Sequence, residues 1–226
     1  MKIPLSSRLL ACCDFVATGD RVADIGCDHG YLGIYLLTKG IASTIIAADI
    51  NQGPLQCAKR NSEKFGVGDK MACYLSNGVK SIPQDFDTLV CAGMGGDTMI
   101  SILSDAPWLK DEKYRLILQC QSKTPALRQY LSENGWGINR EIVLRDGRFL
   151  YTVMEVIWQG DLPTTHVGEF YYPSVLLKHP TPESMEYYRQ VVKRLRISVA
   201  GHGENADPTE IAALAYLETL FQEESL

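Results

Sequence analysis

The sequence lacks long apolar runs, paired cysteines and a strong excess of one charge. No apolar run approaches the roughly 20 residues that a membrane-spanning helix needs. The N-terminus also lacks a signal-peptide core, so we expect a soluble cytoplasmic protein with no membrane partner. The seven cysteines include no C-x-x-C pair, which argues against disulfides and against a zinc or other metal site. The net charge of −5 leaves an RNA substrate open, because phosphate binding depends on local basic patches.

Short apolar runs alternate with helical patterns over the first 134 residues. Runs typical of strands occupy residues 21–27, 44–50, 71–76, 87–94 and 114–120. Helical patterns occupy residues 5–17, 30–40, 53–66, a short stretch after Gly96, and 123–134. Near-continuous apolar strands joined by helices predict a parallel sheet buried on both faces.

The pattern changes after residue 134. Two long β-rich runs, residues 137–147 and 149–159, are separated only by a short turn at Asp146-Gly147. This arrangement predicts an antiparallel hairpin. Five β/α units followed by such a pair predict a seven-stranded, mostly parallel sheet within residues 1–160.

Two amphipathic helices are predicted after a connector at residues 160–183, which has few periodic signals. Apolar residues at helical spacing follow one side of the first helix: Tyr188, Val191, Val192, Leu195 and Val199. The second begins at Asp207-Pro208, an N-cap followed by proline. We expect it to bury Ile211, Leu214, Leu217 and Phe221. Because a short glycine-containing loop joins them, the helices should form an antiparallel hairpin.

Residues 24–33, DIGCDHGYLG, place a glycine turn between an apolar strand and a helix. Gly26 and Gly30 allow a sharp turn and bring backbone N–H groups close to a ligand. A dinucleotide-binding loop needs glycine where this chain has Asp28, because the pyrophosphate settles on the helix N-terminus. The Asp28 carboxylate would repel a pyrophosphate but suits the cationic amino group of S-adenosylmethionine. Together with Asp24, the loop predicts that cofactor; an ordinary strand–helix turn with an Asp cap is the alternative.

The sheet and the loop together predict an α/β class I Rossmann-like methyltransferase with a C-terminal two-helix hairpin. Asp49 supports it, since it ends the second strand 23 positions after Gly26, where an acidic residue binds ribose hydroxyls. Ile50 beside it is a further cofactor candidate. A helix N-cap is the alternative role for Asp49.

The third and fourth strands also end in candidate binding residues. Asn77 and Gly78 close the third strand, where an amide could bind an adenine edge, although a simple turn is equally consistent. The fourth strand ends in CAGMGG, residues 91–96. Its glycines let flat groups approach the backbone at the edge where doubly wound sheets bind ligands. We assign Ala92 and Gly93 to the cofactor, and Met94, Gly95 and Gly96 to the target.

These motifs, DIGCDHGYL, AADI, SNGV, CAGMGG and LILQ in this order, resemble the bacterial tRNA adenine-22 N1-methyltransferase family. The resemblance is clear from residue 6 to about residue 160 and weaker beyond. It implies methyl transfer from S-adenosylmethionine to N1 of a tRNA adenine, and it implies that residues 161–226 form a helical tRNA-binding domain. The chain differs from the family pattern at Gly33, where proline is frequent, and at Cys120-Gln121, where Pro-Asn is frequent.

The resemblance also suggests catalytic and RNA-binding roles. The N1 lone pair of a flipped-out adenine can attack the methyl group directly, and Asp28 would stabilise the cationic product ring. His29, Tyr31 and Met94 would surround the base, although His29 could instead bond a backbone carbonyl. RNA-contact candidates, beside the two glycines above, are Arg8, Gln119, Arg148, Arg189, Lys193, Arg194 and Arg196. A solvated helix face is the alternative for the last four.

Three interpretations therefore stay open. The first is a tRNA adenine N1-methyltransferase. The second is a methyltransferase of another substrate, a small molecule or a protein. The third is a non-catalytic RNA-binding relative. A monomer is the expected oligomeric state.

Overall fold

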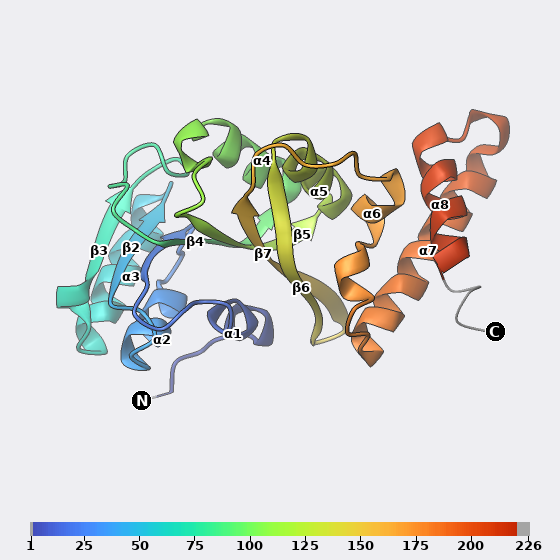
Figure 1. The fold of residues 1–226 in the computed structure, drawn as a ribbon. Helices are drawn as coiled ribbons and strands as arrows, with labels where there is room; N and C mark the ends of the chain where they lie inside the picture. Colours follow the sequence, from blue (N-terminus) through green and yellow to red (C-terminus); the bar gives the residue numbers. More distant parts are fainter. Residues whose placement is uncertain (1, 221–226) are drawn as a thin grey trace.

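Seven strands form a single sheet in this computed structural model, which describes residues 2–220. The strand order is β3-β2-β1-β4-β5-β7-β6. In Figure 1, β3 lies at the left end of the sheet, and β6 lies toward the C-terminal helices. The strands are β1 (Arg21–Ile25), β2 (Thr44–Asp49), β3 (Met71–Leu75), β4 (Thr88–Gly95), β5 (Arg115–Ser122), β6 (Trp136–Asp146) and β7 (Phe149–Trp158). The first five are parallel, and β7 runs antiparallel to its neighbours β5 and β6. This arrangement confirms the predicted class I Rossmann-like sheet.

Helices cover both faces of the sheet. One face carries α1 (Ser7–Cys13), α2 (Tyr31–Thr38) and α3 (Gln52–Lys64). The other face carries α4 (Gly96–Ser104) and α5 (Thr124–Glu133). Two short 3₁₀ helices, η1 (Gly68–Lys70) and η2 (Pro107–Leu109), lie in the connections. Successive strand side chains point to opposite faces, so Val22 and Val90 enter the first core and Ala23 and Leu89 the second.

The first helix is shorter than predicted, ending at Cys13 rather than at residue 17. Beyond it the chain turns more tightly, with the Phe15 N–H bonded to the Cys12 carbonyl and the Val16 N–H to the Cys13 carbonyl, both at 3.2 Å. Phe15 and Val16 are still buried. The apolar pattern of the sequence extends beyond the helix because the residues of this turn pack into the same core.

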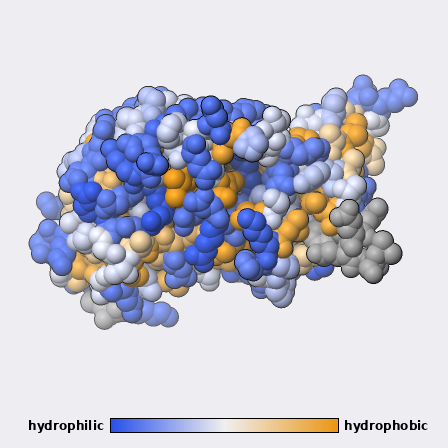
Figure 2. Space-filling model, in the orientation of Figure 1, coloured by the Kyte–Doolittle hydropathy of each residue, from blue (hydrophilic) through white to orange (hydrophobic). Residues whose placement is uncertain are grey.

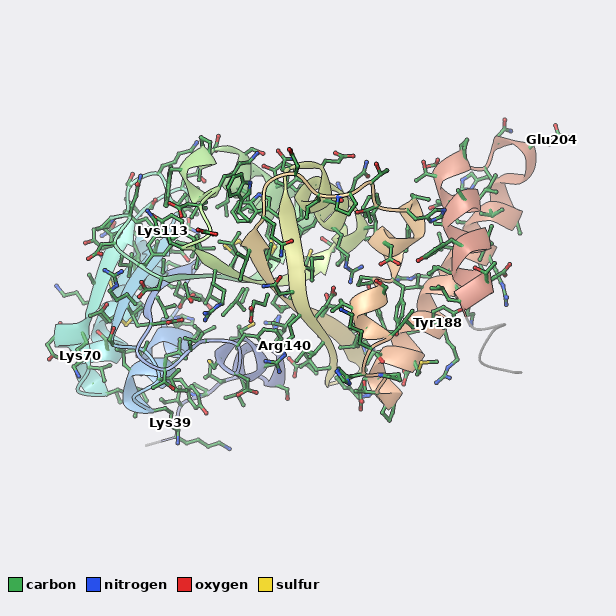
Figure 3. All side chains as sticks on the ribbon, viewed as in Figure 1. Lys39, Lys70, Lys113, Arg140, Tyr188 and Glu204 are labelled. Carbon is green, nitrogen blue, oxygen red and sulfur yellow. The ribbon has the colours of Figure 1, made fainter. Side chains whose placement is uncertain are left out.

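The C-terminal segment consists of α6 (Val167–Tyr171), η3 (Ser174–Leu176), α7 (Pro182–His202), η4 (Gly203–Asn205) and α8 (Pro208–Leu220). The helices α7 and α8 lie side by side at the right of Figure 1, which confirms the predicted helical hairpin. Asp207 accepts a 2.8 Å hydrogen bond from the Thr209 N–H, as an N-cap does. The Tyr188 hydroxyl, labelled on α7 in Figure 3, donates to the Leu217 carbonyl at 2.8 Å and ties the two helices together.

Two predictions for this segment are wrong. Residues 160–183 include a helix and a 3₁₀ turn rather than a plain connector. Leu217 is fully buried, as predicted, and Leu214 is half-buried, but Ile211 is 46% exposed and Ala213 is fully buried in its place; Phe221 lies outside the described residues. A Cβ atom on Gly168 would collide with the Tyr216 ring. Because α8 is apolar on most sides, its sequence does not determine which face is buried; the tight contact with α6 does.

A buried arginine joins the sheet domain to the C-terminal segment. Arg128 on α5 and Glu141 on β6 are bonded at 2.5 Å, and both side chains are almost completely buried. The same guanidinium donates to the carbonyl oxygens of Phe170 at 2.8 Å and Tyr171 at 3.3 Å. Three elements therefore meet at one arginine, which fixes α6 against the edge of the sheet domain.

Hydrophilic residues cover most of the face drawn in Figure 2, with small hydrophobic patches between them. Several of these patches lie near the junction with the C-terminal helices. In residues 2–220, no helix has both the length and the hydropathy to span a membrane.

Candidate active site

The loop between β1 and α2 contains three residues with left-handed backbone angles. The φ angles are 72° at Gly26, 50° at Asp28 and 73° at Gly30. Aspartate is one of the few non-glycine residues that tolerate this region. Asp28 thus keeps the backbone conformation for which a dinucleotide-binding loop uses glycine. A Cβ atom on Gly30 would lie 2.7 Å from the Met71 Cε, so the loop packs directly against its neighbours.

Asp49 joins this loop to the end of β2. Its Oδ2 atom accepts a 3.2 Å hydrogen bond from the Asp28 N–H, and its Oδ1 atom accepts one of 2.8 Å from the Asn51 N–H. Each oxygen keeps a further lone pair for a ligand. Asn51 is the N-cap of α3, so the alternative role of Asp49 as that cap is wrong.

Two exposed apolar side chains lie at the same edge of the sheet. Ile50, directly after β2, is 62% exposed, and Leu75, the last residue of β3, is 55% exposed. Exposed large apolar groups beside a polar site are typical of ligand-binding surfaces. Leu75 was not predicted from the sequence as a binding residue. Its position as an apolar residue at the end of a parallel strand could have indicated that role.

Asp24 lies buried beneath the loop at 4% exposure. Its carboxylate accepts a hydrogen bond from the Gly33 N–H, while its Oδ2 atom has no hydrogen-bond partner among residues 2–220. The pKa of Asp24 is raised to about 7, chiefly because the carboxyl is buried; the Gly33 hydrogen bond opposes this shift, and the nearby Asp49 charge adds to it. A proline at position 33, which is frequent in the family, has no N–H and could not donate this bond. Gly33 therefore gives Asp24 a hydrogen bond that proline would remove.

Asp28, His29 and Tyr31 form the outer side of the loop. The side chains of Asp28 and His29 are 70% and 51% exposed, and their Oδ1 and Nε2 atoms lie 3.6 Å apart. The rings of His29 and Tyr31 have centroids 6.1 Å apart. The His29 ring thus faces Asp28 rather than a backbone carbonyl, and all three side chains are accessible to a substrate.

The end of β4 closes the other side of the loop. The Met94 methyl group packs directly over Gly26, and Gly93 takes a left-handed φ of 80°, while Ala92 is half-buried beside it. Gln119 is fully buried; its Oε1 atom accepts from the Gly93 N–H at 3.1 Å, and its Nε2 atom donates to the Cys120 carbonyl at 3.2 Å. The expectation that Gln119 contacts RNA is wrong, because this side chain supports the loop from inside.

Two other candidate glycines serve close packing. A Cβ atom on Gly96 would lie 2.7 Å from the Lys123 carbonyl oxygen, and one on Gly78 would lie 2.9 Å from the Ile102 Cγ1. Gly96 is buried, so its predicted contact with the target is wrong. Gly95, the half-buried N-cap of α4, and the exposed Asn77 stay candidates.

Comparison with known proteins identifies the family. Residues 5–154 match the family model described as a methyltransferase domain. The tRNA (adenine(22)-N(1))-methyltransferase of Bacillus subtilis (strain 168) is 32% identical over 168 residues, which are 74% of this chain and 70% of that protein. The chain belongs to this methyltransferase family.

Two solved structures resemble the methyltransferase over nearly its whole length. The M1A22 tRNA methyltransferase TrmK of B. subtilis is 25% identical with a TM-score of 0.81, covering 98% of this chain and 97% of that one. Sp1610 of Streptococcus pneumoniae, in complex with S-adenosyl-L-methionine, is 25% identical with a TM-score of 0.83, covering 96% and 99%. The similarity therefore includes the C-terminal helices.

Basic residues of the methyltransferase differ in how far their charge is already paired. Arg8 lies 3.7 Å from the Asp146 carboxylate, and Arg196 on α7 is bonded to Glu218 on α8 at 2.8 Å. These pairs weaken the predicted RNA-binding role of both arginines, because part of their charge is neutralised.

Three other cations are available to a ligand. Arg189 and Lys193 are exposed on α7, and neither has a salt-bridge partner within residues 2–220. Arg148 is exposed at the β6–β7 turn, with its guanidinium 4.9 Å from the Phe149 ring centroid. In the described part of the chain, no group of three or more His, Cys, Asp or Glu side chains could hold a metal ion.

Proposed function

We propose that this methyltransferase transfers the methyl group of S-adenosylmethionine to N1 of an adenine in tRNA. Its relatives with this fold carry that activity in their names. The observation that carries the proposal is the Asp28–Asp49 hydrogen bond at the edge of the sheet, because it combines the family's aspartate loop with the acid that a nucleoside cofactor needs.

The cofactor fits the residues present. The free lone pairs of Asp49 would accept the ribose hydroxyls, and Ile50 and Leu75 would pack against the adenine ring. The unpartnered Oδ2 atom of Asp24, together with the Asp28 carboxylate, would compensate the cationic amino group, since a buried charge needs a partner. When bound, this cofactor supplies a methyl group already activated by the sulfonium charge.

The protein's own residues then position the target base. The N1 lone pair of neutral adenine needs no base to activate it, so alignment is the main requirement. Asp28 is exposed at the loop and would stabilise the positive charge that the ring gains. His29 and Tyr31 would contact the base from the loop, and Met94 and Gly95 from the end of β4.

The RNA surface is proposed to include the C-terminal segment, residues 161–226. Arg189 and Lys193 would contact phosphates from α7, and Arg148 would extend this surface from the β6–β7 turn. A cytoplasmic location follows from tRNA as the substrate and is part of the same proposal; the expectation of a monomer stays a prediction.

A methyl-transfer assay with competing acceptors tests this function. Purified protein and radiolabelled S-adenosylmethionine are incubated with tRNA transcript, with a bacterial protein extract, and with a small-molecule extract. Label in tRNA alone is the expected result. Label in protein or small molecules would support the second interpretation, and cofactor binding without transfer to any acceptor would support the third. Asp49→Ala is the inactive control, and the exposed Asp69→Ala is its matched surface control.

A further inference from the structure

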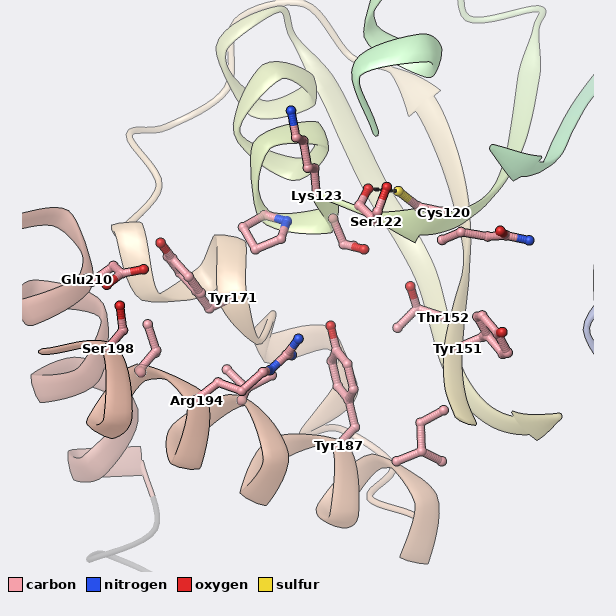
Figure 4. A pocket seen from close by; sticks show the side chains of 16 residues that line it. Cys120, Ser122, Lys123, Tyr151, Thr152, Tyr171, Tyr187, Arg194, Ser198 and Glu210 are labelled. Carbon is pink, nitrogen blue, oxygen red and sulfur yellow. Dashed lines mark hydrogen bonds between the residues drawn. The ribbon is translucent and has the colours of Figure 1, made fainter. Parts of the chain in front are cut away.

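A cavity of about 410 Å³ lies between the end of β5 and the C-terminal helices (Figure 4). Its sheet-domain side includes Ser122 and Thr152, and its helical side includes Tyr171, Tyr187, Arg194 and Glu210. None of these residues belongs to the cofactor loop. This volume lies within the range of small-molecule binding sites.

Thr152 provides an unpartnered buried hydroxyl on one wall. The residue is 3% exposed, and its Oγ1 atom has no hydrogen-bond partner among residues 2–220. Figure 4 shows the hydroxyl directed toward the space below Ser122. Buried polar groups are nearly always hydrogen-bonded, so this atom is a ready partner for a polar ligand that enters the cavity.

Arg194 provides an available positive charge on the opposite wall. It has no carboxylate within salt-bridge distance in the described range 2–220, whereas Arg196 is paired with Glu218 and Arg145 with Glu186. In Figure 4 its side chain rises from α7 into the cavity, beside the Tyr187 ring. A guanidinium in this position suits a phosphate group.

Aromatic rings complete the lining. The Tyr187 ring lies next to the buried Tyr172 ring, with centroids 6.2 Å apart. Tyr171 lies on the same side, near Glu210. Unstacked RNA bases bind on aromatic side chains and arginine planes. The lining also includes Lys123, which is paired with Asp97, and the Glu210 carboxylate. Rings, the Arg194 guanidinium and one unpartnered hydroxyl together match a single nucleotide better than an apolar ligand.

The cavity lies next to the end of β4, which carries part of the candidate active site. In the β4–β5 register, Met94 pairs with Cys120 and Gly95 pairs with Ser122. The Gln121 amide lies 3.5 Å from the Cβ position of Gly93, and Gln121 also lines the cavity. An RNA strand delivering a base to Met94 would therefore pass the cavity mouth.

We propose that this cavity holds one unstacked nucleotide of the RNA substrate, and this inference rests on the proposed tRNA methylation. Arg194 binds its phosphate, Tyr187 stacks on its base, and Thr152 hydrogen-bonds the base or ribose. The site would hold the strand in register and so help to select the adenine that is methylated.

Steady-state methylation of tRNA transcript tests this with a matched pair of variants. Arg194→Gln should raise the KM for tRNA about tenfold, the loss expected for one charged hydrogen bond, without changing the Kd for S-adenosylmethionine. Arg196→Gln on the same helix, already paired with Glu218, should change the KM less than twofold. Equal effects of the two variants would overturn the proposal.

A second measurement does not depend on loss of function. The photoreactive amino acid p-benzoylphenylalanine replaces Tyr187 in the full chain. The complex of this variant with tRNA is irradiated, and the crosslinked nucleotide is mapped by reverse-transcription stops. Adducts at one nucleotide within a few positions of the methylated adenine are expected; adducts scattered along the tRNA, or none, would overturn the proposal. If the unaltered protein methylates no tRNA at all, the proposed function has failed. If it does and these tests fail, only the cavity assignment has failed.

Discussion

The backbone N–H of Asp28 donates a 3.2 Å hydrogen bond to the carboxylate of Asp49. This bond links the loop after β1 to the end of β2, two segments that meet because their strands are parallel neighbours. Asp28 holds this position with a left-handed φ of 50°. A non-glycine side chain is therefore retained where glycine would be less strained, as is frequent at functional sites.

Replacement of Asp28 should separate stability from activity. Asp28→Gly keeps the left-handed turn and should leave the free energy of unfolding unchanged or raise it by about 0.5–1 kcal/mol, whereas Asp28→Ala should lower it by about 1 kcal/mol. Both should slow methyl transfer at least about tenfold, because the charge opposite the cationic base is lost. Thermal unfolding and single-turnover methylation measure the two effects. Near wild-type transfer by Asp28→Gly would remove Asp28 from the chemistry.

Asp24 should make the stability of the cofactor-free protein depend on pH. Its pKa is about 7 in the fold against an ordinary value of 3.8 for an aspartate, so the folded protein binds more protons between these values. Stability should therefore fall as pH rises from about 4 to about 7, by on the order of 2–4 kcal/mol. Urea unfolding measures this slope, and Asp24→Asn should reduce it. An unchanged slope in that variant would rule out Asp24 as its source.

The same group should couple cofactor binding to proton release. The cationic amino group favours the ionised form of Asp24, so affinity for S-adenosylmethionine should rise with pH up to about 7. Calorimetry in two buffers of different ionisation enthalpy should detect a proton released at pH 6. Affinity that stays flat over this range would contradict the role given to Asp24.

The Arg128–Glu141 pair should govern the attachment of the C-terminal segment. Arg128→Met leaves the Glu141 charge buried without a partner and should lower the free energy of unfolding by about 3–5 kcal/mol. The double variant with Glu141→Leu should lose clearly less, since no lone charge remains. Denaturant unfolding of the single and double variants makes the comparison. Equal losses in both would show that packing, rather than charge compensation, dominates at this joint.

Charge reversal on α7 should weaken tRNA binding in a salt-dependent way. Arg189→Glu combined with Lys193→Glu removes two phosphate contacts and should reduce the slope of log K against log salt by about 1.4–1.8. Lys39 and Lys70, at the far end of the molecule in Figure 3, supply the control: the same reversal there should have little effect. Binding measured by filter retention that is unchanged in the α7 variant would remove this helix from the RNA interface.

The sequence predicted features whose partners are local or in the adjacent β/α unit. Glycine and aspartate spacing places Asp28 and Asp49 at one sheet edge, since parallel strands end together. The apolar strands likewise predict a sheet covered on both faces.

Long-range packing decided the features that could not be predicted. Gln119 was predicted to contact RNA because it lies near the end of a strand. Its side-chain oxygen instead accepts a hydrogen bond from the Gly93 N–H on the neighbouring strand. Arg194 and Arg196 are alike in sequence, and only Glu218 on the other helix distinguishes them. The buried face of α8 depends on its contact with Gly168 on α6. The pattern of apolar residues within α8 gives no information about this contact.

Nucleoside mass spectrometry identifies both the base and the atom that receive the methyl group. An unmodified tRNA transcript with adenosine at position 22, and a matched transcript with guanosine there, are incubated with the protein and S-adenosylmethionine and digested to nucleosides. We expect 1-methyladenosine from the first transcript and none from the second. No methyladenosine from either, or a methyl group on another atom of the base, would contradict it.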